Sequence, residues 1–234
     1  MKLDKHAEAV NTLNSIKDRV LETLKEKRCS EKQISDIIFK EYRKNKLKTK
    51  GKPKVIVSFG KNTAEVHHFP KAVTLQEGPI MLDLWAKLDK GHFADLTWMA
   101  YKGNPSKEFV KMFREVVKAR DKALKFIKKS IKNRYLPTFF EIDAIARAYL
   151  AKKRSGYAFK HKIGHPLGLK DVHGDGNVKA KSKEYYNQIR LEQPYTLEPG
   201  LYFKHFGIRL ENDFCIDQKF RLHTTLVQNK LIRI

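Results

Sequence analysis

Residues 79–101 read PIMLDLWAKLDKGHFADLTWMAY, two apolar runs separated by a polar turn. The residue types in each run predict a β-strand, the first over 79–88 and the second over 93–101. Between them, Asp89-Lys90-Gly91 has the residue types that a turn uses. The stretch therefore predicts two consecutive strands, which would form a hairpin if they pair with each other.

Each of these two strands carries an aspartate. Because side chains alternate along a strand, Asp83 shares a face with Trp85, and Asp95 shares a face with Thr97. In a hairpin the two carboxylates can converge, and one must then bind a proton unless a cation lies between them. The pair alone is a weak signal, because a solvated aspartate in a turn is commoner than a metal ligand.

Before the hairpin, the sequence predicts two helices and a strand. Apolar residues at helical spacing predict an amphipathic helix over 3–28. Ser30 and Gln33 fit a capping box that opens a second helix. The run 54–59 (KVIVSF) predicts a strand that ends at Gly60.

After the hairpin, the sequence predicts two more helices and a region of strands and turns. Asn104, followed by a proline in the first turn, is expected to cap a long helix. Thr138 and Glu141 fit a second capping box, before a helix that is expected to stop near Gly156. The remainder, 157–234, is rich in Gly, Pro, Tyr and Phe.

The composition is that of one globular chain. No Gly/Ser-rich linker or short repeat divides the 234 residues, so we expect a single mixed α/β domain over 1–234. There is no apolar run long enough to span a membrane and no secretory signal at the N-terminus. Cys29 and Cys215 are too few for a disulfide scaffold or a zinc ribbon. We therefore expect a reduced, cytoplasmic protein that does not associate with a membrane.

The formal net charge of +23 comes mainly from lysine. Such a surface attracts phosphates and other anions. However, the sequence has no ribonucleoprotein-type aromatic motif, no zinc-finger spacing and no Arg-Gly-rich tail. A nucleic-acid partner therefore stays open as an alternative, and a solvated Lys-rich surface is the interpretation that we favour.

The polar residues that carry chemistry concentrate after residue 158. The segment 158–175 (AFKHKIGHPLGLKDVHGD) places three histidines among glycines: His161, His165 and His173. Neutral imidazole is the commonest transition-metal ligand. Further on, Glu198 precedes a Pro-Gly turn, and Arg209 and Glu211 share a strand face. Arg209 could pair with a carboxylate. In that case the C-terminal group of Glu198, Arg209 and Glu211 would have a purely structural role.

Taken in order, these motifs resemble the pita-bread metallopeptidases, a group that includes aminopeptidase P, prolidase and methionine aminopeptidase. The resemblance is closest to the Xaa-Pro-processing branch and covers about three-quarters of the chain. The motifs that carry it are SFG at 58–60, HHFP at 67–70, D…GHFAD at 83–95, HKIGH at 161–165, DVHGDG at 171–176, LEPGLY at 197–202 and GIRLEND at 207–213.

The resemblance implies an α/β (α+β) pita-bread fold, with a curved, mostly antiparallel sheet covered by helices. It implies a dinuclear centre in which Asp95 and Glu211 bridge two divalent ions, Asp83 completes one coordination sphere, and His165 with Glu198 completes the other. Hard oxygen ligands with one imidazole suit Mn²⁺ or Co²⁺ best, with Fe²⁺ or Zn²⁺ as further options.

The resemblance also implies an activity, that of an exopeptidase. A hydroxide bridging the two ions would attack an N-terminal peptide bond, as in Xaa-Pro aminopeptidases or prolidases. Glu198 matches the general base that carries the proton to the leaving amine. Three further positions match the pocket histidines that stabilise the tetrahedral intermediate: His67, His161 and His173. Thr97 and Arg209 match residues that orient the carboxylates.

This sequence departs from the family pattern at several positions. Asp83–Asp95 and His165–His173 each span one residue more than usual, Trp98 stands where an Arg is common, and Pro166 replaces the Gly after the ligand histidine. We place the first extra residue in the turn at 89–91, because inside a strand it would turn Asp95 to the wrong face.

Since the match begins almost at Met1, we expect no separate N-terminal domain of the kind found in prolidase and aminopeptidase P. The cleft would then be capped by a partner, by a homodimer mate or by nothing. Besides a peptidase that acts on peptide substrates, two alternatives remain. The first is a catalytically silent protein that binds RNA, the ribosome or another anionic partner. The second is a creatinase-like amidinohydrolase that needs no metal.

Overall fold

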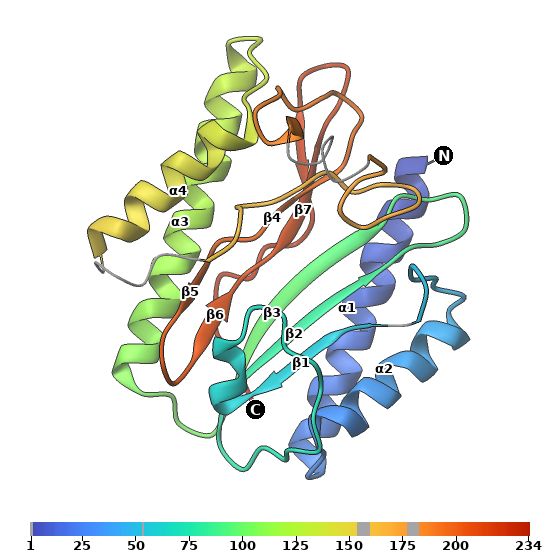
Figure 1. The fold of residues 1–234 in the computed structure, drawn as a ribbon, viewed down its shortest axis with the longest axis vertical. Coiled ribbons are helices and arrows are strands. Elements are labelled where there is room, and N and C mark those ends of the chain that lie inside the picture. Colours follow the sequence, from blue (N-terminus) through green and yellow to red (C-terminus); the bar gives the residue numbers. More distant parts are fainter. Residues whose placement is uncertain (1, 53, 154–159, 177–182) are drawn as a thin grey trace.

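The computed structural model describes residues 2–52, 54–153, 160–176 and 183–234. In it, the strands lie between two layers of helices, α1 and α2 on one side and α3 and α4 on the other (Figure 1). The expected fold class, mixed α/β with mostly antiparallel strands, is confirmed. None of the described helices has the length and apolar content needed to cross a membrane.

The N-terminal half forms the first layer and its sheet. Helices α1 (Lys2–Glu26) and α2 (Glu31–Lys44) pack their apolar faces on β1 (Ile56–Phe59), β2 (Gly78–Ala86) and β3 (Ala94–Lys102). Ser30 and Gln33 form the predicted capping box. A short 3-10 helix, η1 (Gly60–Ala64), follows β1.

The first sheet has the strand order β1-β2-β3-β9. The pairs β1–β2 and β2–β3 are antiparallel, so the predicted hairpin is confirmed. The C-terminal strand β9 (Ile232–Arg233) adds to β3 in parallel.

The C-terminal half forms the second layer. Helices α3 (Lys107–Lys132) and α4 (Phe139–Lys153) pack over five short strands. These strands are β4 (Tyr195–Leu197), β5 (Gly200–Tyr202), β6 (Gly207–Arg209), β7 (Asn212–Ile216) and β8 (Leu222–Thr224). They form a three-stranded sheet, β4-β7-β8, and a two-stranded sheet, β5-β6.

The predicted start of α3 is wrong by two residues. The N-cap is Ser106, whose backbone is extended and whose Oγ accepts a hydrogen bond from the Phe109 N–H at 3.1 Å. Asn104 instead donates its backbone N–H to Glu77 at 3.0 Å. Ser106 lies three residues before Phe109, which is the spacing between an N-cap and its backbone donor. The proline between Asn104 and Ser106 therefore precedes the cap.

The capping box that opens α4 is confirmed. The Thr138 N–H and hydroxyl both donate to Glu141, and the Glu141 N–H donates to the Thr138 hydroxyl. The predicted stop near Gly156 lies outside the described residues.

The two halves meet along a seam between β3 and the β6–β7 connection. Thr97 of β3 forms an isolated antiparallel bridge with Glu211, and the Glu211 N–H donates to the Thr97 carbonyl at 3.1 Å. Because each half has its own apolar core, polar side chains that point into this seam are buried between the two.

Candidate metal centre

The β2–β3 hairpin presents its two aspartates on one face. Asp83 pairs across the strands with Thr97, and Trp85 pairs with Asp95. The pairing runs without a bulge from Gly78–Lys102 to Ala86–Ala94. An extra residue between the aspartates is therefore absorbed in the connecting turn, as the sequence predicts, and Asp95 keeps the face of Asp83.

The loop that carries His165 is fixed to β4. The His165 N–H donates to the Thr196 hydroxyl at 3.1 Å, and the Thr196 N–H donates to the His165 carbonyl at 2.9 Å. At Gly164 an added Cβ would lie 2.1 Å from the Thr196 carbonyl oxygen, so only glycine permits this approach. The imidazole Nε2 then lies 3.7 Å from Asp95 Oδ2 and 3.8 Å from Glu198 Oε1.

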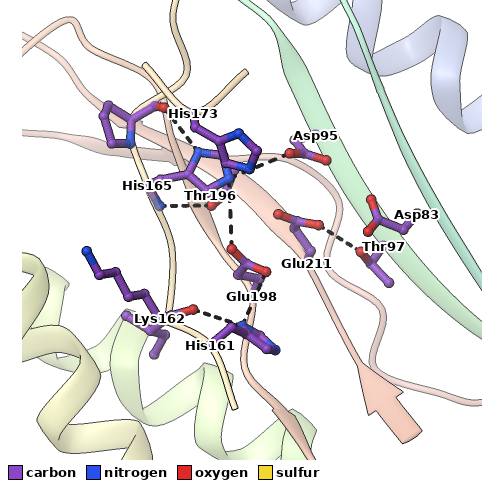
Figure 2. A network of polar contacts seen from close by, with 12 residues as sticks. Asp83, Asp95, Thr97, His161, Lys162, His165, His173, Thr196, Glu198 and Glu211 are labelled. Carbon is purple, nitrogen blue, oxygen red and sulfur yellow. Dashed lines mark hydrogen bonds and ion pairs between the residues drawn. The ribbon is translucent and has the colours of Figure 1, made fainter. Parts of the chain in front are cut away.

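The two glutamates reach the same place from the connections beside β4 and β6. Glu198 follows β4, and its N–H donates to the Ile163 carbonyl at 2.7 Å. Glu211 lies between β6 and β7, and its Oε2 accepts a hydrogen bond from the Thr97 hydroxyl at 2.7 Å. Figure 2 shows Asp83, Asp95, His165, Glu198 and Glu211 directed toward a common centre.

These five side chains line one cavity of about 590 Å³. Oxygen or nitrogen atoms of Asp95, His165 and Glu211 lie within 4.8 Å of one another, close enough for one ion to contact all three. Asp83 lies outside this group and forms an ion pair with Arg209, and Glu198 also lies outside it, with its Oε1 3.8 Å from His165 Nε2. The structure thus brings together all five of the predicted ligands, three of them as a tight group.

Arg209 and Thr97 hold the carboxylates, as expected of residues that orient ligands. The buried Arg209 guanidinium pairs with Asp83 and donates to the Thr97 hydroxyl at 3.3 Å. It also donates to the Tyr202 hydroxyl and to the Val66 carbonyl, each at 3.0 Å. One guanidinium therefore links β2, β3 and β6 behind the cavity.

Burial makes the four carboxylates hard to ionise together. It raises the pKa of Asp83 and, to about 8, that of Glu198, while the Arg209 charge opposes both shifts. Burial and then repulsion from neighbouring carboxylates raise the pKa of Asp95 and Glu211 well above the usual range. With these carboxylates ionised, the cavity requires additional positive charge.

Unused oxygen atoms show that the cavity suits a cation. Within the described part of the chain, Oδ1 of Asp83 and Oδ1 of Asp95 are buried and accept no hydrogen bond. Buried acceptors without a partner are costly, and divalent ions are natural partners for carboxylate oxygens. The donor set, four carboxylates and one imidazole, therefore fits hard or borderline divalent ions.

The three predicted pocket histidines occupy different parts of the cavity. His161 is inside, where its Nε2 lies 2.8 Å from the Tyr202 hydroxyl and its Nδ1 lies 2.9 Å from the Lys162 carbonyl. Burial and the Arg209 charge lower the pKa of His161 to about 3, so it is neutral. His67 lines the wall. His173 lies at the rim, with its side chain 60% exposed and its ring 4.5 Å from that of His165.

Sequence reasoning missed the residues that support this site from outside. Tyr202 is the last residue of the LEPGLY motif, and its hydroxyl joins His161 to Arg209. Asp213 is also buried, and its Oδ2 accepts the Asp95 N–H at 3.2 Å. The only signal in the sequence for this role of Asp213 is its position directly after Glu211 and Asn212 in the motif GIRLEND.

Two buried histidines were missed as well. His6 on α1 lies 2.9 Å from Asp213. His68 has one ring nitrogen 2.7 Å from Glu31 and the other 2.9 Å from Glu65, so it anchors the loop that carries His67. Contacts that span 37 and 207 residues leave no periodic signal in the sequence.

Comparison with known proteins agrees with this geometry. The sequence model of metallopeptidase family M24 matches residues 4–218. A peptidase of Staphylococcus epidermidis, named as uncharacterized, is 30% identical over 164 residues, which are 70% of this chain and 44% of that protein. The chain therefore spans less than half the length of this curated relative.

Solved structures share the fold. A prolidase from Thermococcus sibiricus superposes with a TM-score of 0.81 at 24% identity, covering 100% of this chain and 61% of that one. An X-prolyl aminopeptidase from Caenorhabditis elegans, described as a cytosolic enzyme with a di-nuclear active site, superposes with a TM-score of 0.69 at 20% identity. That match covers 96% of this chain and 37% of the other. The pita-bread architecture expected from the motifs is confirmed.

Proposed function

The chain belongs to metallopeptidase family M24, and on that basis we propose that it is a metal-dependent exopeptidase of the Xaa-Pro-processing kind. It would release an N-terminal residue or split a dipeptide. All of the proposed ligands lie between Asp83 and Glu211, so a single catalytic domain carries the site.

One observation carries this proposal, the convergence of four buried carboxylates and one imidazole on a single cavity. Four ionised carboxylates hold four negative charges, which two divalent ions would neutralise. Asp95 and Glu211 would be ligands of both ions, Asp83 would be a further ligand of one, and His165 with Glu198 would be further ligands of the other. Mn²⁺ and Co²⁺ suit this set best, followed by Fe²⁺ and Zn²⁺.

Bound divalent ions would supply Lewis-acid polarisation of the scissile carbonyl and would activate water near neutral pH. The protein itself handles the proton. Glu198 accepts a proton from the attacking water and delivers it to the leaving amine nitrogen.

The histidines and the buried arginine position the reacting groups. His67, His161 and His173 surround the cavity as hydrogen-bond partners for the substrate carbonyl as it gains negative charge. Arg209 and Thr97 restrict the rotation of Asp83 and Glu211 through the contacts described above. Trp85, on the same strand face as Asp83, supplies an apolar wall that can contact a substrate side chain.

A peptide digest tests the proposal. The protein, loaded with Mn²⁺ or Co²⁺, is incubated with X-Pro, Met-X and other unblocked peptides, and the released residues are identified. We expect N-terminal cleavage, with loss of at least 100-fold in kcat for Glu198→Gln. Glu22→Gln, at an exposed site on α1, is the matched control and should retain full activity.

The outcome separates the proposal from its alternatives. No cleavage of any peptide by metal-loaded protein would favour a catalytically silent binding protein. Hydrolysis that persists in EDTA would favour a metal-independent amidinohydrolase.

A further inference from the structure

Of the two long helices of this protein, one carries a large excess of positive charge. Helix α3 carries ten Lys and Arg against three Asp and Glu, whereas α1, which is one residue shorter, carries five against five. The two helices lie on opposite sides of the strands (Figure 1). If the lysines served only to keep the protein soluble, two helices of similar length would not need to differ in net charge.

The charges of α3 form an exposed stripe. Its basic residues recur every three or four positions, which places them along one side of the helix. At 1.5 Å per residue the helix is about 39 Å long. The basic residues of the stripe are Lys107, Lys111, Arg114, Lys118, Lys122, Lys125, Lys128, Lys129 and Lys132, all of them exposed.

Little of this charge is neutralised nearby. In α3, Glu115 pairs with Lys118 at 3.1 Å, and Asp121 pairs with the buried Arg120 at 2.7 Å. In α1, by contrast, lysines pair with glutamates three residues away at 2.7 Å on both the first and the last turns. Among the described residues, Lys111 and Lys125 make no ion pair.

Exposed aromatic side chains lie where α3 ends. Tyr135 is 40% exposed and its hydroxyl donates to Glu141 on α4 at 2.8 Å. Phe140 and Tyr186 are 53% and 66% exposed, with ring centroids 5.7 Å apart. Flat exposed rings beside a basic surface provide what bases and phosphates bind in single-stranded nucleic acids.

We propose that α3 and these aromatic residues form a binding surface for single-stranded nucleic acid. The lysine stripe follows the phosphate backbone, and the rings at its end stack on bases. Because lysine is a point charge without the fork of arginine, binding is independent of base sequence. This surface is distinct from the proposed peptidase site, because no residue of α3 lines that cavity, and Phe140 and Tyr186 adjoin it through Tyr185, whose ring contacts both of theirs.

The exposed face of α3 fits other anionic partners less well. A helix that binds a membrane surface presents apolar side chains outward, yet no large, exposed apolar residue of the described chain lies in α3. Stable protein interfaces have an apolar centre and few lysines. A second copy of this chain would place like charges together.

Fluorescence anisotropy with a labelled 20-nucleotide poly(U) tests the surface over a range of salt concentrations. The test variant replaces Lys111, Lys125, Lys129 and Lys132 with Gln. The control variant removes the same charge from the opposite side of the molecule, at four exposed lysines of α2 and the turn after it: Lys32, Lys40, Lys44 and Lys46.

We expect wild type and control to bind alike, with a dissociation constant near the micromolar range at physiological salt. The α3 variant should bind at least tenfold more weakly. The slope of log K against log salt should fall by about 0.7 for each phosphate that the variant no longer neutralises, up to about 3. Equal weakening in both variants would show that net charge alone is responsible, and would overturn the proposal.

A second pair of measurements tests the aromatic part. Phe140→Ala with Tyr186→Ala should weaken poly(U) binding about tenfold or more and leave the salt slope unchanged. Poly(dT) tests whether the sugar matters. Competition by poly-glutamate or by phosphatidylserine vesicles as strong as by poly(U), with no effect of the aromatic changes, would overturn the assignment to nucleic acid. Peptidase activity should persist in the lysine variants, because none of the replaced side chains lines the cavity.

Discussion

The buried carboxylates should make the metal-free protein less stable as the pH rises, and Glu198 allows the size of this effect to be worked out. Its pKa is raised in the folded state to about 8 from 4.5. The folded protein therefore holds this proton more tightly than the unfolded chain does. Stability from Glu198 is complete below pH 4.5, and it is lost progressively as the pH rises from 4.5 to 8.

At pH 7 the loss from this one group is substantial. The interval from 4.5 to pH 7, at about 1.4 kcal/mol for each pH unit, amounts to about 3 kcal/mol in the free energy of unfolding. In urea, with a slope of about 2 kcal/mol per molar, that is a midpoint shift of about 1.5 M. Glu198→Gln has no proton to lose at this position and should not show this part of the pH dependence.

The assay is urea unfolding of wild type and Glu198→Gln in EDTA at pH 4.5, 5, 6, 7 and 8. The stability difference between the two proteins should move by about 3 kcal/mol in favour of the variant between pH 4.5 and 7. His161, whose pKa is lowered to about 3, contributes the opposite trend below pH 6.5, but it is present in both proteins.

Added metal should reverse the trend in wild type. Divalent ions bind the ionised carboxylates, so excess Mn²⁺ should restore stability as the pH rises. Parallel pH profiles for wild type and Glu198→Gln in EDTA would refute the reasoning, because they would show that Glu198 is not forced to hold a proton by its surroundings.

Three further outcomes follow from the same contacts. Arg209→Met leaves Asp83 buried without its partner and should destabilise the metal-free protein by about 3–5 kcal/mol in urea unfolding; an effect below 1 kcal/mol would contradict the buried ion pair. Gly164→Ala would place a methyl group 2.1 Å from the Thr196 carbonyl oxygen, so it should weaken metal affinity at least tenfold in calorimetry, and unchanged affinity would mean that this approach is not required. EDTA should abolish peptide cleavage and added Mn²⁺ or Co²⁺ should restore it, whereas full activity in EDTA would count against a metallopeptidase.

Local sequence patterns predicted the parts of the fold that depend on neighbours in the chain. Strand alternation placed Asp83 with Trp85 and Asp95 with Thr97, and the hairpin register brings both aspartates to one face. The capping boxes at Ser30 and Thr138 depend on residues three positions apart and are also confirmed. The cap of α3 was missed because Asn104 and Ser106 are both good caps, and only the contact of the asparagine backbone with Glu77 separates them.

The candidate site needed information that no local pattern contains. The convergence of His165, Glu198 and Glu211 was inferred from the family resemblance, since composition and spacing do not fix which strands meet. Asp213 supports the site through a contact across the seam between the two halves, and Tyr202 supports it through a contact with His161, 41 positions away in the same half. The sequence around an aromatic or acidic residue in a short strand does not indicate such contacts, so they are found only in the structure.

The central claim, that this cavity is a dinuclear metal centre, is tested most directly by counting bound ions. Metal-free protein would be dialysed against Mn²⁺, and the bound metal would be measured by elemental analysis for wild type and for Asp95→Asn. We expect two ions per wild-type chain and a loss of at least one in the variant, because Asp95 lies in the tight group with His165 and Glu211. Wild-type protein that binds no Mn²⁺ or Co²⁺, or an Asp95→Asn protein that still binds two ions with the same affinity, would contradict the account.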